Sequence, residues 1–235
     1  EGKIFTDGIK NPKIIFVLNH AGFSQVFMLK GQKLPQSFIL FLKKSVELPA
    51  YFHIYEADSR LPEALKEAGL DVKVRERQQL RFLSDKPVRA GALPKGYKAY
   101  DCNEVGFEKL GVFGLGLDKK FWSSASDFIN NAYGKCILGP DRTPVSICYS
   151  ACISCGISEI DILTLPEYRG KGLARIAAQL FINESIAKGL QPNWDCFSDN
   201  AASLRIARSF GFIPLKTYRF LSVSNKTKQG AGYAS

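Results

Sequence analysis

Histidine is scarce in this chain, because His20 and His53 are the only two among its 235 residues. Cys148, Cys152 and Cys155 have a close spacing that metal sites use, but no fourth ligand is evident and both histidines lie far away in the sequence. We therefore expect no metal. All six cysteines lie in apolar segments, which favours buried, reduced thiols in a cytoplasmic protein over a disulfide framework.

Long apolar runs are also absent. No stretch reaches the roughly 18 residues that a membrane helix requires, so we expect no membrane partner. Hydrophobic residues nevertheless make up 46% of the chain and charged residues 23%, which is enough apolar surface to build a core and excludes a disordered chain. A length of 235 residues allows one large domain or two small ones.

Acidic residues are fewer than basic ones, 22 against 32, so the formal net charge is +10. A basic surface attracts polyanions, including nucleic acid and phosphorylated cofactors. The basic residues form no single long run, however, and an ordinary solvated face explains the charge equally well. Nucleic acid is therefore a less favoured partner than a small molecule.

Hydrophobic periodicity predicts a small α/β domain over residues 1–90 and a larger domain over 91–235. In the first domain we expect strands at 14–18, 25–29, 51–55 and 72–82 and helices at 35–47 and 61–68. Proline and glycine concentrate at 85–96, which indicates a linker. In the second domain we expect a glycine-rich loop or, equally, a packed turn at 106–116, and a helix at 121–132 with Ser124 or Ser126 as its cap. Consecutive strands are expected at 135–138, 145–153 and 157–165.

The period changes from that of a strand to that of a helix after Leu165. Residues 169–174, Arg-Gly-Lys-Gly-Leu-Ala, connect the two patterns. The first N–H groups of a helix lack partners and its dipole is positive there, so a helix start binds anions. Glycine lets a diphosphate approach the backbone closely. This segment therefore predicts a pyrophosphate cradle.

A second motif follows. Residues 194–197 predict a short strand, Asn200-Ala-Ala-Ser203 opens a helix, and Phe210-Gly211-Phe212 ends it. Together with Arg-x-x-Gly-x-Ala after a strand, this order resembles the GNAT superfamily of N-acetyltransferases over residues 98–223. The segments 161–164, 168–174 and 194–196 are most similar to a bacterial two-domain subgroup that includes a zwittermicin A self-resistance acetyltransferase.

The resemblance implies an α/β (α+β) fold with a central mixed, mostly antiparallel sheet flanked by helices, beside the smaller N-terminal α/β domain. It implies acetyl-CoA as co-substrate, with its pantetheine arm inserted where the strand before the cradle splays from its neighbour. Leu163 and Leu165 would offer backbone groups to that arm. The cofactor-binding residues that it implies are Leu163, Thr164, Leu165, Arg169, Gly170, Lys171, Gly172, Leu173, Ala174, Asn200 and Ser203. Asn200 would serve equally well as a plain helix N-cap.

Acetyl transfer to an amine requires a proton acceptor and stabilisation of the thioester oxygen. Glu159 and Asp161 lie two residues apart on a predicted strand, hence on one face, and neighbouring carboxylates disfavour each other's ionisation. We expect Glu159, which matches a catalytic glutamate of several family members, to be the general base and Asp161 to attract the amine. The usual tyrosine acid is replaced by Ala207, so Tyr218 or a water would act instead.

Two other functions remain open. A GNAT toxin that acylates aminoacyl-tRNA fits the charge of +10, because phosphate contacts dominate nucleic-acid affinity, although the extra domain argues against it. A non-catalytic acyl-CoA-binding protein fits the missing acid. The preferred reading is an acetyl-CoA-dependent N-acetyltransferase that acts on the primary amine of a small molecule or antibiotic, as a monomer or homodimer.

Overall fold

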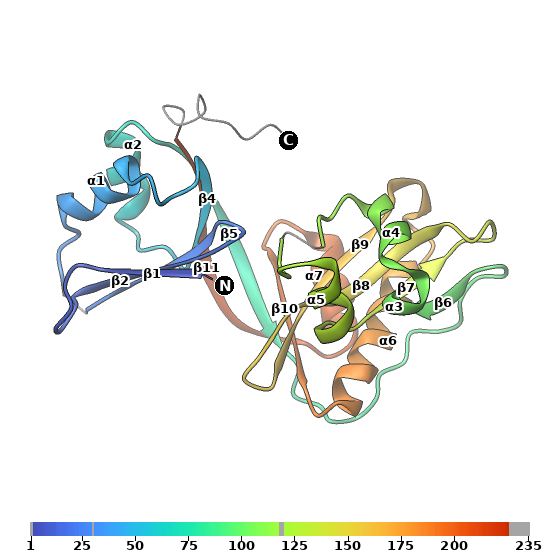
Figure 1. The fold of residues 1–235 in the computed structure, drawn as a ribbon. Helices are drawn as coiled ribbons and strands as arrows, with labels where there is room; N and C mark the ends of the chain where they lie inside the picture. The colour runs from blue at the N-terminus through green and yellow to red at the C-terminus, as the bar shows by residue number, and fades with distance from the viewer. Residues whose placement is uncertain (1, 30, 118–119, 226–235) are drawn as a thin grey trace. The chain divides into compact units, whose positions relative to one another are not determined.

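The structure, a computed structural model, describes residues 2–29, 31–117 and 120–225. The chain forms two compact units, Glu1–Arg77 with Thr217–Ser235, and Gln78–Lys216 (Figure 1). These units divide the chain after Arg77, and the chain re-enters the first unit at Thr217, whereas we predicted domains over 1–90 and 91–235. Residues 226–235 of the predicted second domain lie outside the described residues.

The first unit is a sheet with two helices. Its strands are β1 (Gly2–Thr6), β2 (Ile14–Asn19), β3 (Phe23–Met28) and β4 (Tyr51–Tyr55), and its helices are α1 (Gln36–Lys44) and α2 (Leu61–Glu67). β5 (Asp71–Arg81) and β11 (Ile213–Ser224) contribute residues to both units. Alternate residues of β2 are buried, and Phe16 packs with Leu42 of α1 and Leu65 of α2 in one core. The pattern of period two therefore places this core on one face of the sheet.

The second unit contains a mixed sheet in the order β10-β9-β8-β7-β6. The strands are β6 (Lys98–Asp101), β7 (Gly134–Leu138), β8 (Pro144–Ser154), β9 (Ile157–Thr164) and β10 (Gln191–Phe197). The pairs from β6 to β9 are antiparallel, and β9 pairs with β10 in parallel. The predicted α/β fold with a mixed, mostly antiparallel sheet flanked by helices is confirmed.

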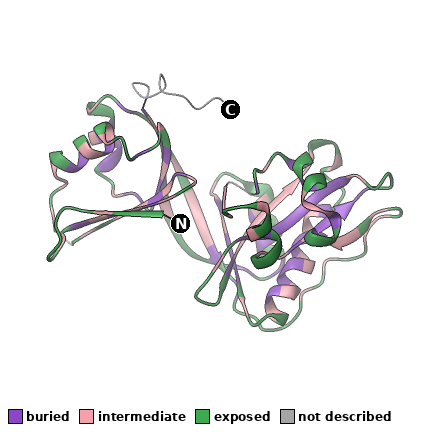
Figure 2. Cartoon of the chain, in the orientation of Figure 1, coloured by how far each residue is buried: buried purple, intermediate pink, exposed green. Residues whose placement is uncertain are grey.

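Helices cover both faces of this sheet. α6 (Leu173–Ala187) and α7 (Ala201–Ser209) share a core with Cys148 and Trp194 on one face. α3 (Cys102–Val105), α4 (Phe107–Leu110), the 3-10 helix η1 (Gly111–Phe113) and α5 (Ala125–Asn131) lie on the other. Tyr149 and Phe128 are buried there, and Figure 2 shows the buried strands between the layers.

Several local expectations need correction. Residues 106–116, expected as a loop or a packed turn, contain α4 and η1. The helix expected from residue 121 begins after Ser124, one of its two predicted caps, whose hydroxyl accepts a hydrogen bond from the Asp127 N–H. Cys152 and Cys155 are exposed rather than buried, because they lie next to the β8–β9 turn. No helix in the described ranges is long and apolar enough to cross a membrane.

Candidate active site

The predicted cradle joins β9 to α6. The 3-10 helix η2 (Pro166–Tyr168) leads into Gly170 and Gly172, whose φ angles are 77° and 76°. Such left-handed values favour glycine, and a Cβ added at either position would meet nothing within 4 Å. None of the first-turn residues of α6, all of which are described, is acidic. The helix start is therefore an open, electropositive turn with the chemistry of a phosphate site.

Two cationic side chains flank this turn. Arg169 donates a hydrogen bond from Nε to the Thr164 carbonyl oxygen at 3.2 Å. Lys171 lies 4.8 Å from the centre of the Tyr168 ring, and its Nζ is 3.3 Å from the Tyr97 hydroxyl. Leu173, which we also assigned to the cofactor, is buried in the core and anchors the first turn of the helix, so only its backbone faces the cradle.

The edge of β9 that faces β10 is paired at only one end. In the described residues the two strands pair from Ile157 to Glu159, although β9 continues to Thr164. The Leu165 N–H donates to the Val145 carbonyl of β8 at 3.0 Å. Successive residues of a strand direct their backbone groups to opposite neighbours, so Leu163 also faces β8. The backbone groups at the unpaired edge are those of Ile162 and Thr164, not those of Leu163 and Leu165.

Glu159 is held by a partner that we did not predict. Asn193 of β10 lies beside it in the parallel register. The Asn193 side-chain amide donates to both Glu159 carboxylate oxygens, at 2.7 and 2.8 Å, and Asn193 itself is buried. These hydrogen bonds orient a half-buried carboxylate on the face of the sheet opposite α6.

Asp161 has contacts on three sides. The hydroxyl of Tyr149, its register partner on β8, donates to Oδ2 at 2.6 Å, and the Ile162 N–H donates to Oδ1 at 3.0 Å. The Lys120 ammonium lies 3.6 Å from Oδ2. Burial, together with the Asp161 charge, raises the pKa of Tyr149 far above its ordinary value, so this hydroxyl remains a donor. Asp161 therefore accepts hydrogen bonds from Tyr149 and Ile162 while it pairs with the Lys120 ammonium.

The second motif is occupied by structural contacts. Asn200 accepts a hydrogen bond from the Ser203 N–H at 3.1 Å, which is the N-cap geometry of α7. The Ser203 hydroxyl accepts from the Trp194 indole at 2.9 Å. Both side chains thus stabilise the fold. These contacts account for the two residues without cofactor binding, and their assignment to the cofactor stays a prediction.

The position of the missing acid, Ala207, and the candidate replacement, Tyr218, lie in different environments. Ala207 is fully buried in the core of the second unit, where it packs rather than reacts. Tyr218 belongs to the first unit, and its ring lies 6.1 Å from the ring of Tyr55. The assignment of Tyr218 as the acid stays a prediction.

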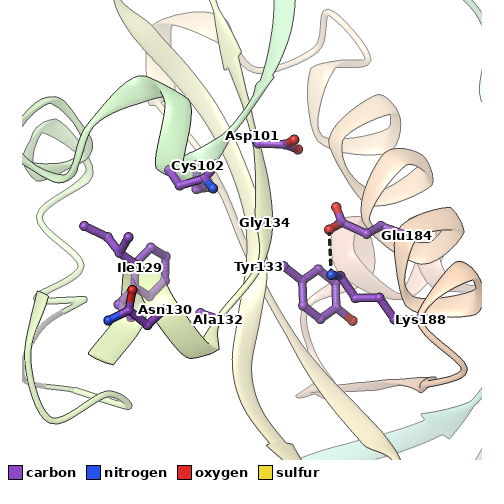
Figure 3. Close-up of a pocket in the computed structure, with 11 residues that line it drawn as sticks. Asp101, Cys102, Ile129, Asn130, Ala132, Tyr133, Gly134, Glu184 and Lys188 are labelled. Carbon is purple, nitrogen blue, oxygen red and sulfur yellow. Dashed lines mark ion pairs between the residues drawn. The ribbon is translucent and has the colours of Figure 1, made fainter. Parts of the chain in front are cut away.

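A separate pocket of about 240 Å³ lies at the far end of α6. Asp101, Tyr133, Glu184 and Lys188 are among its lining residues, and Figure 3 shows Glu184 paired with Lys188. The cradle and this pocket are separated by the 15-residue helix, which is about 22 Å long. None of the residues that we predicted for the site lines this pocket, so the cradle and carboxylates form a different region.

Sequence reasoning missed four residues of this region. Alternation within 191–197 separates the face of Asn193 from that of Trp194, but its place beside Glu159 follows only from the pairing of β10 with β9. Tyr149 and Lys120 reach Asp161 through tertiary pairing, which no local pattern encodes. The sequence predicts Ile162 as a packing residue because its side chain is apolar. Its backbone N–H, however, is the group that faces the unpaired edge. Among the described residues, no group of three or more His, Cys, Asp or Glu could hold a metal ion.

The sequence matches the GNAT acetyltransferase family over residues 1–221. It is 27% identical over 222 residues, 92% of this chain and 84% of the relative, to YdfB of Bacillus subtilis, an uncharacterized N-acetyltransferase. A GCN5-related N-acetyltransferase-like protein of Streptococcus suis has a TM-score of 0.74 at 20% identity and covers 94% of this chain and 88% of its own. A GCN5-related N-acetyltransferase of Kribbella flavida has a TM-score of 0.63 at 14% identity, and the match covers 98% of this chain and 92% of its own. These two structures share the fold.

Proposed function

The chain belongs to the GNAT acetyltransferase family and is an N-acetyltransferase, and from this premise we propose that it transfers an acetyl group from acetyl-CoA to a primary amine of a small molecule. One observation carries the proposal: β9 and the turn after it bring together three features. These are an unpaired backbone edge, an open glycine turn and two carboxylates. The edge and turn suit a CoA thioester, and the carboxylates suit an amine.

Members of the family generally use acetyl-CoA. We assign the pyrophosphate to the N–H groups of residues 170–174, with Arg169 and Lys171 supplying positive charge. The pantetheine amides would pair with the backbone of Ile162 and Thr164. The Thr164 carbonyl oxygen now accepts a hydrogen bond from Arg169, and this bond must break before the carbonyl can pair with the pantetheine arm. A bound phosphate would attract the Arg169 guanidinium and so release the carbonyl. When bound, acetyl-CoA supplies an acetyl group activated as a thioester.

The carboxylates divide the work on the amine. Asp161 binds the incoming ammonium, and Glu159, held by Asn193, accepts the proton that must leave before the nitrogen attacks. The Ile162 N–H points to the unpaired edge, and we assign it as the backbone donor to the carbonyl oxygen as that oxygen gains negative charge. Asp161 occupies this N–H now, so drawing the carboxylate towards an ammonium would release the donor.

Titration calorimetry of acetyl-CoA with the wild type and Gly172→Glu tests the cradle. The new carboxylate would repel the pyrophosphate, and we expect binding to be lost. Gly189→Glu is a matched control, because Gly189 has a φ of 68° and open space at the other end of the same helix. If both variants bind as the wild type does, the cradle does not hold the pyrophosphate.

An amine screen with Glu159→Gln then tests the base. This variant keeps the shape of the side chain and can still hydrogen bond with Asn193, but it cannot accept a proton. We expect acetyl-CoA affinity to be unchanged and turnover to fall by about 100-fold, the lower range for loss of a general base. Full turnover by Glu159→Gln would contradict the assigned role.

A further inference from the structure

Asp161, the proposed amine-binding carboxylate, already forms an ion pair with a primary ammonium of the chain itself, that of Lys120. Lys120 Nζ lies 3.6 Å from Asp161 Oδ2, and it also lies 4.5 Å from the centre of the Phe121 ring. A carboxylate and an aromatic face are the two groups that recognise an alkylammonium. The side chains of Lys120 and Asp161 are 40% and 30% exposed, so an external amine from solvent can compete for the same place.

The position of this ammonium matches that of an acceptor. Asp161 is two residues from Glu159 on the same face of β9, a separation of about 7 Å along the strand. A proton from an amine at Asp161 can therefore reach Glu159 through ordered water. Lys120 also has the chemistry of the acceptor class, because its nucleophile is a primary amine at the end of an unbranched alkyl chain.

We propose that Lys120 is an internal acceptor, so that the enzyme acetylates its own Lys120 when no external amine occupies Asp161. This inference rests on the proposed function of Asp161 and Glu159. It also specifies the external substrate class as an unbranched primary alkylammonium, which Lys120 imitates.

The reaction balances without a further reagent. The Lys120 ammonium loses a proton towards Glu159, and its nitrogen forms a bond with the thioester carbonyl carbon. The carbon–sulfur bond breaks, the sulfur leaves as a thiolate, and the nitrogen loses a second proton. One proton is taken up by the thiolate and the other by solvent, so the products are acetyl-lysine and CoA.

The test is site-resolved mass spectrometry of the full chain incubated with acetyl-CoA. Lys66 is the internal control, because it is also paired with a carboxylate, Glu63 at 3.8 Å, and is 49% exposed. We expect Lys120 to be labelled about 100-fold faster than Lys66, since a held amine reacts intramolecularly. Fragmentation distinguishes Lys120 from its neighbour Lys119. The rate constant should not depend on protein concentration, and excess butylamine should slow it.

Three variants make the result decisive. Labelling of Lys120 should fall to the level of Lys66 in Gly172→Glu and in Asp161→Asn, whereas Gly189→Glu should label normally. Equal labelling of Lys120 and Lys66 in the wild type overturns the inference. If butylamine is then still acetylated, the proposed function stands without it. If acetyl-CoA binds but neither butylamine nor Lys120 is acetylated, the proposed function itself fails.

Discussion

Replacing Tyr149 by Phe removes one hydroxyl and nothing else. Tyr149 is fully buried, and its hydroxyl donates to Asp161 at 2.6 Å. A hydrogen bond to a charged group contributes about 1.5–3 kcal/mol. Because the Asp161 side chain is 30% exposed, water can replace part of the lost bond. We therefore expect Tyr149→Phe to lower the free energy of unfolding at pH 7 by about 1.5 kcal/mol, the lower end of that range.

The same substitution changes how stability depends on pH. Burial raises the pKa of folded Tyr149 above the ordinary 10.0, which the unfolded chain keeps. Above pH 10 the unfolded chain therefore binds fewer protons than the folded one, and the stabilising contribution, complete below pH 10, is lost as pH rises. For one group this loss is about 1.4 kcal/mol per pH unit. The variant lacks this contribution, so its stability should fall less steeply.

Urea denaturation under reducing conditions at pH 7, 10.5 and 11.5 measures both effects. Tyr133→Phe is the control for the measurement at pH 7 only, because burial also raises the pKa of Tyr133. Its hydroxyl contacts the neutral Ser185 hydroxyl at 2.7 Å, and its loss should cost only about 1 kcal/mol at pH 7. Because Asp161 loses one of the three contacts that orient it, we also expect a higher KM for the amine in Tyr149→Phe and little change in kcat. Equal slopes between pH 10.5 and 11.5 in wild type and Tyr149→Phe would refute this account of Tyr149.

Three further substitutions test other contacts. Asn193→Ala removes the amide that orients Glu159, and kcat/KM for the amine should fall about tenfold, with acetyl-CoA affinity in calorimetry unchanged. Asn200→Ala should lose about 1 kcal/mol of stability in urea, whereas Asn200→Ser keeps the cap; weaker acetyl-CoA binding by both would instead identify Asn200 as a ligand. Gly134→Ala places a Cβ 2.7 Å from the Tyr149 Cβ and should cost about 1–3 kcal/mol in the same assay, so an unchanged midpoint would show that the strands shift freely.

Most of the fold is readable from the sequence where burial is one-sided. The apolar alternation of residues 14–18 predicts β2, and the change of period after Leu165 predicts the start of α6. β1 was not predicted because four of its five residues are exposed and show no apolar alternation. The course of the last strand could not be predicted either, because β11 pairs antiparallel with β4, a contact between distant parts of the chain.

The glycine turn and the shared face of Glu159 and Asp161 could be predicted for different reasons, whereas their roles in cofactor and amine binding stay predictions. A glycine turn before a helix is a local motif, and two residues at a spacing of two on a strand share a face whatever surrounds them. Asp161 has an environment that no spacing reveals, because Tyr149 and Lys120 approach it from other elements. The sequence therefore identifies the residues of the proposed site better than it identifies the contacts that hold them.

The error over Leu163 and Leu165 follows from a limit of periodicity itself. Side-chain alternation states which face a residue is on, but the direction of its N–H and C=O depends on which residue begins the ladder with the neighbouring strand. A single hydrogen bond, from the Leu165 N–H to Val145, decides this for the end of β9. It directs the backbone groups of Ile162 and Thr164 to the unpaired edge, where they contact Asp161 and Arg169, and these are the two contacts that the proposed binding of acetyl-CoA would have to displace.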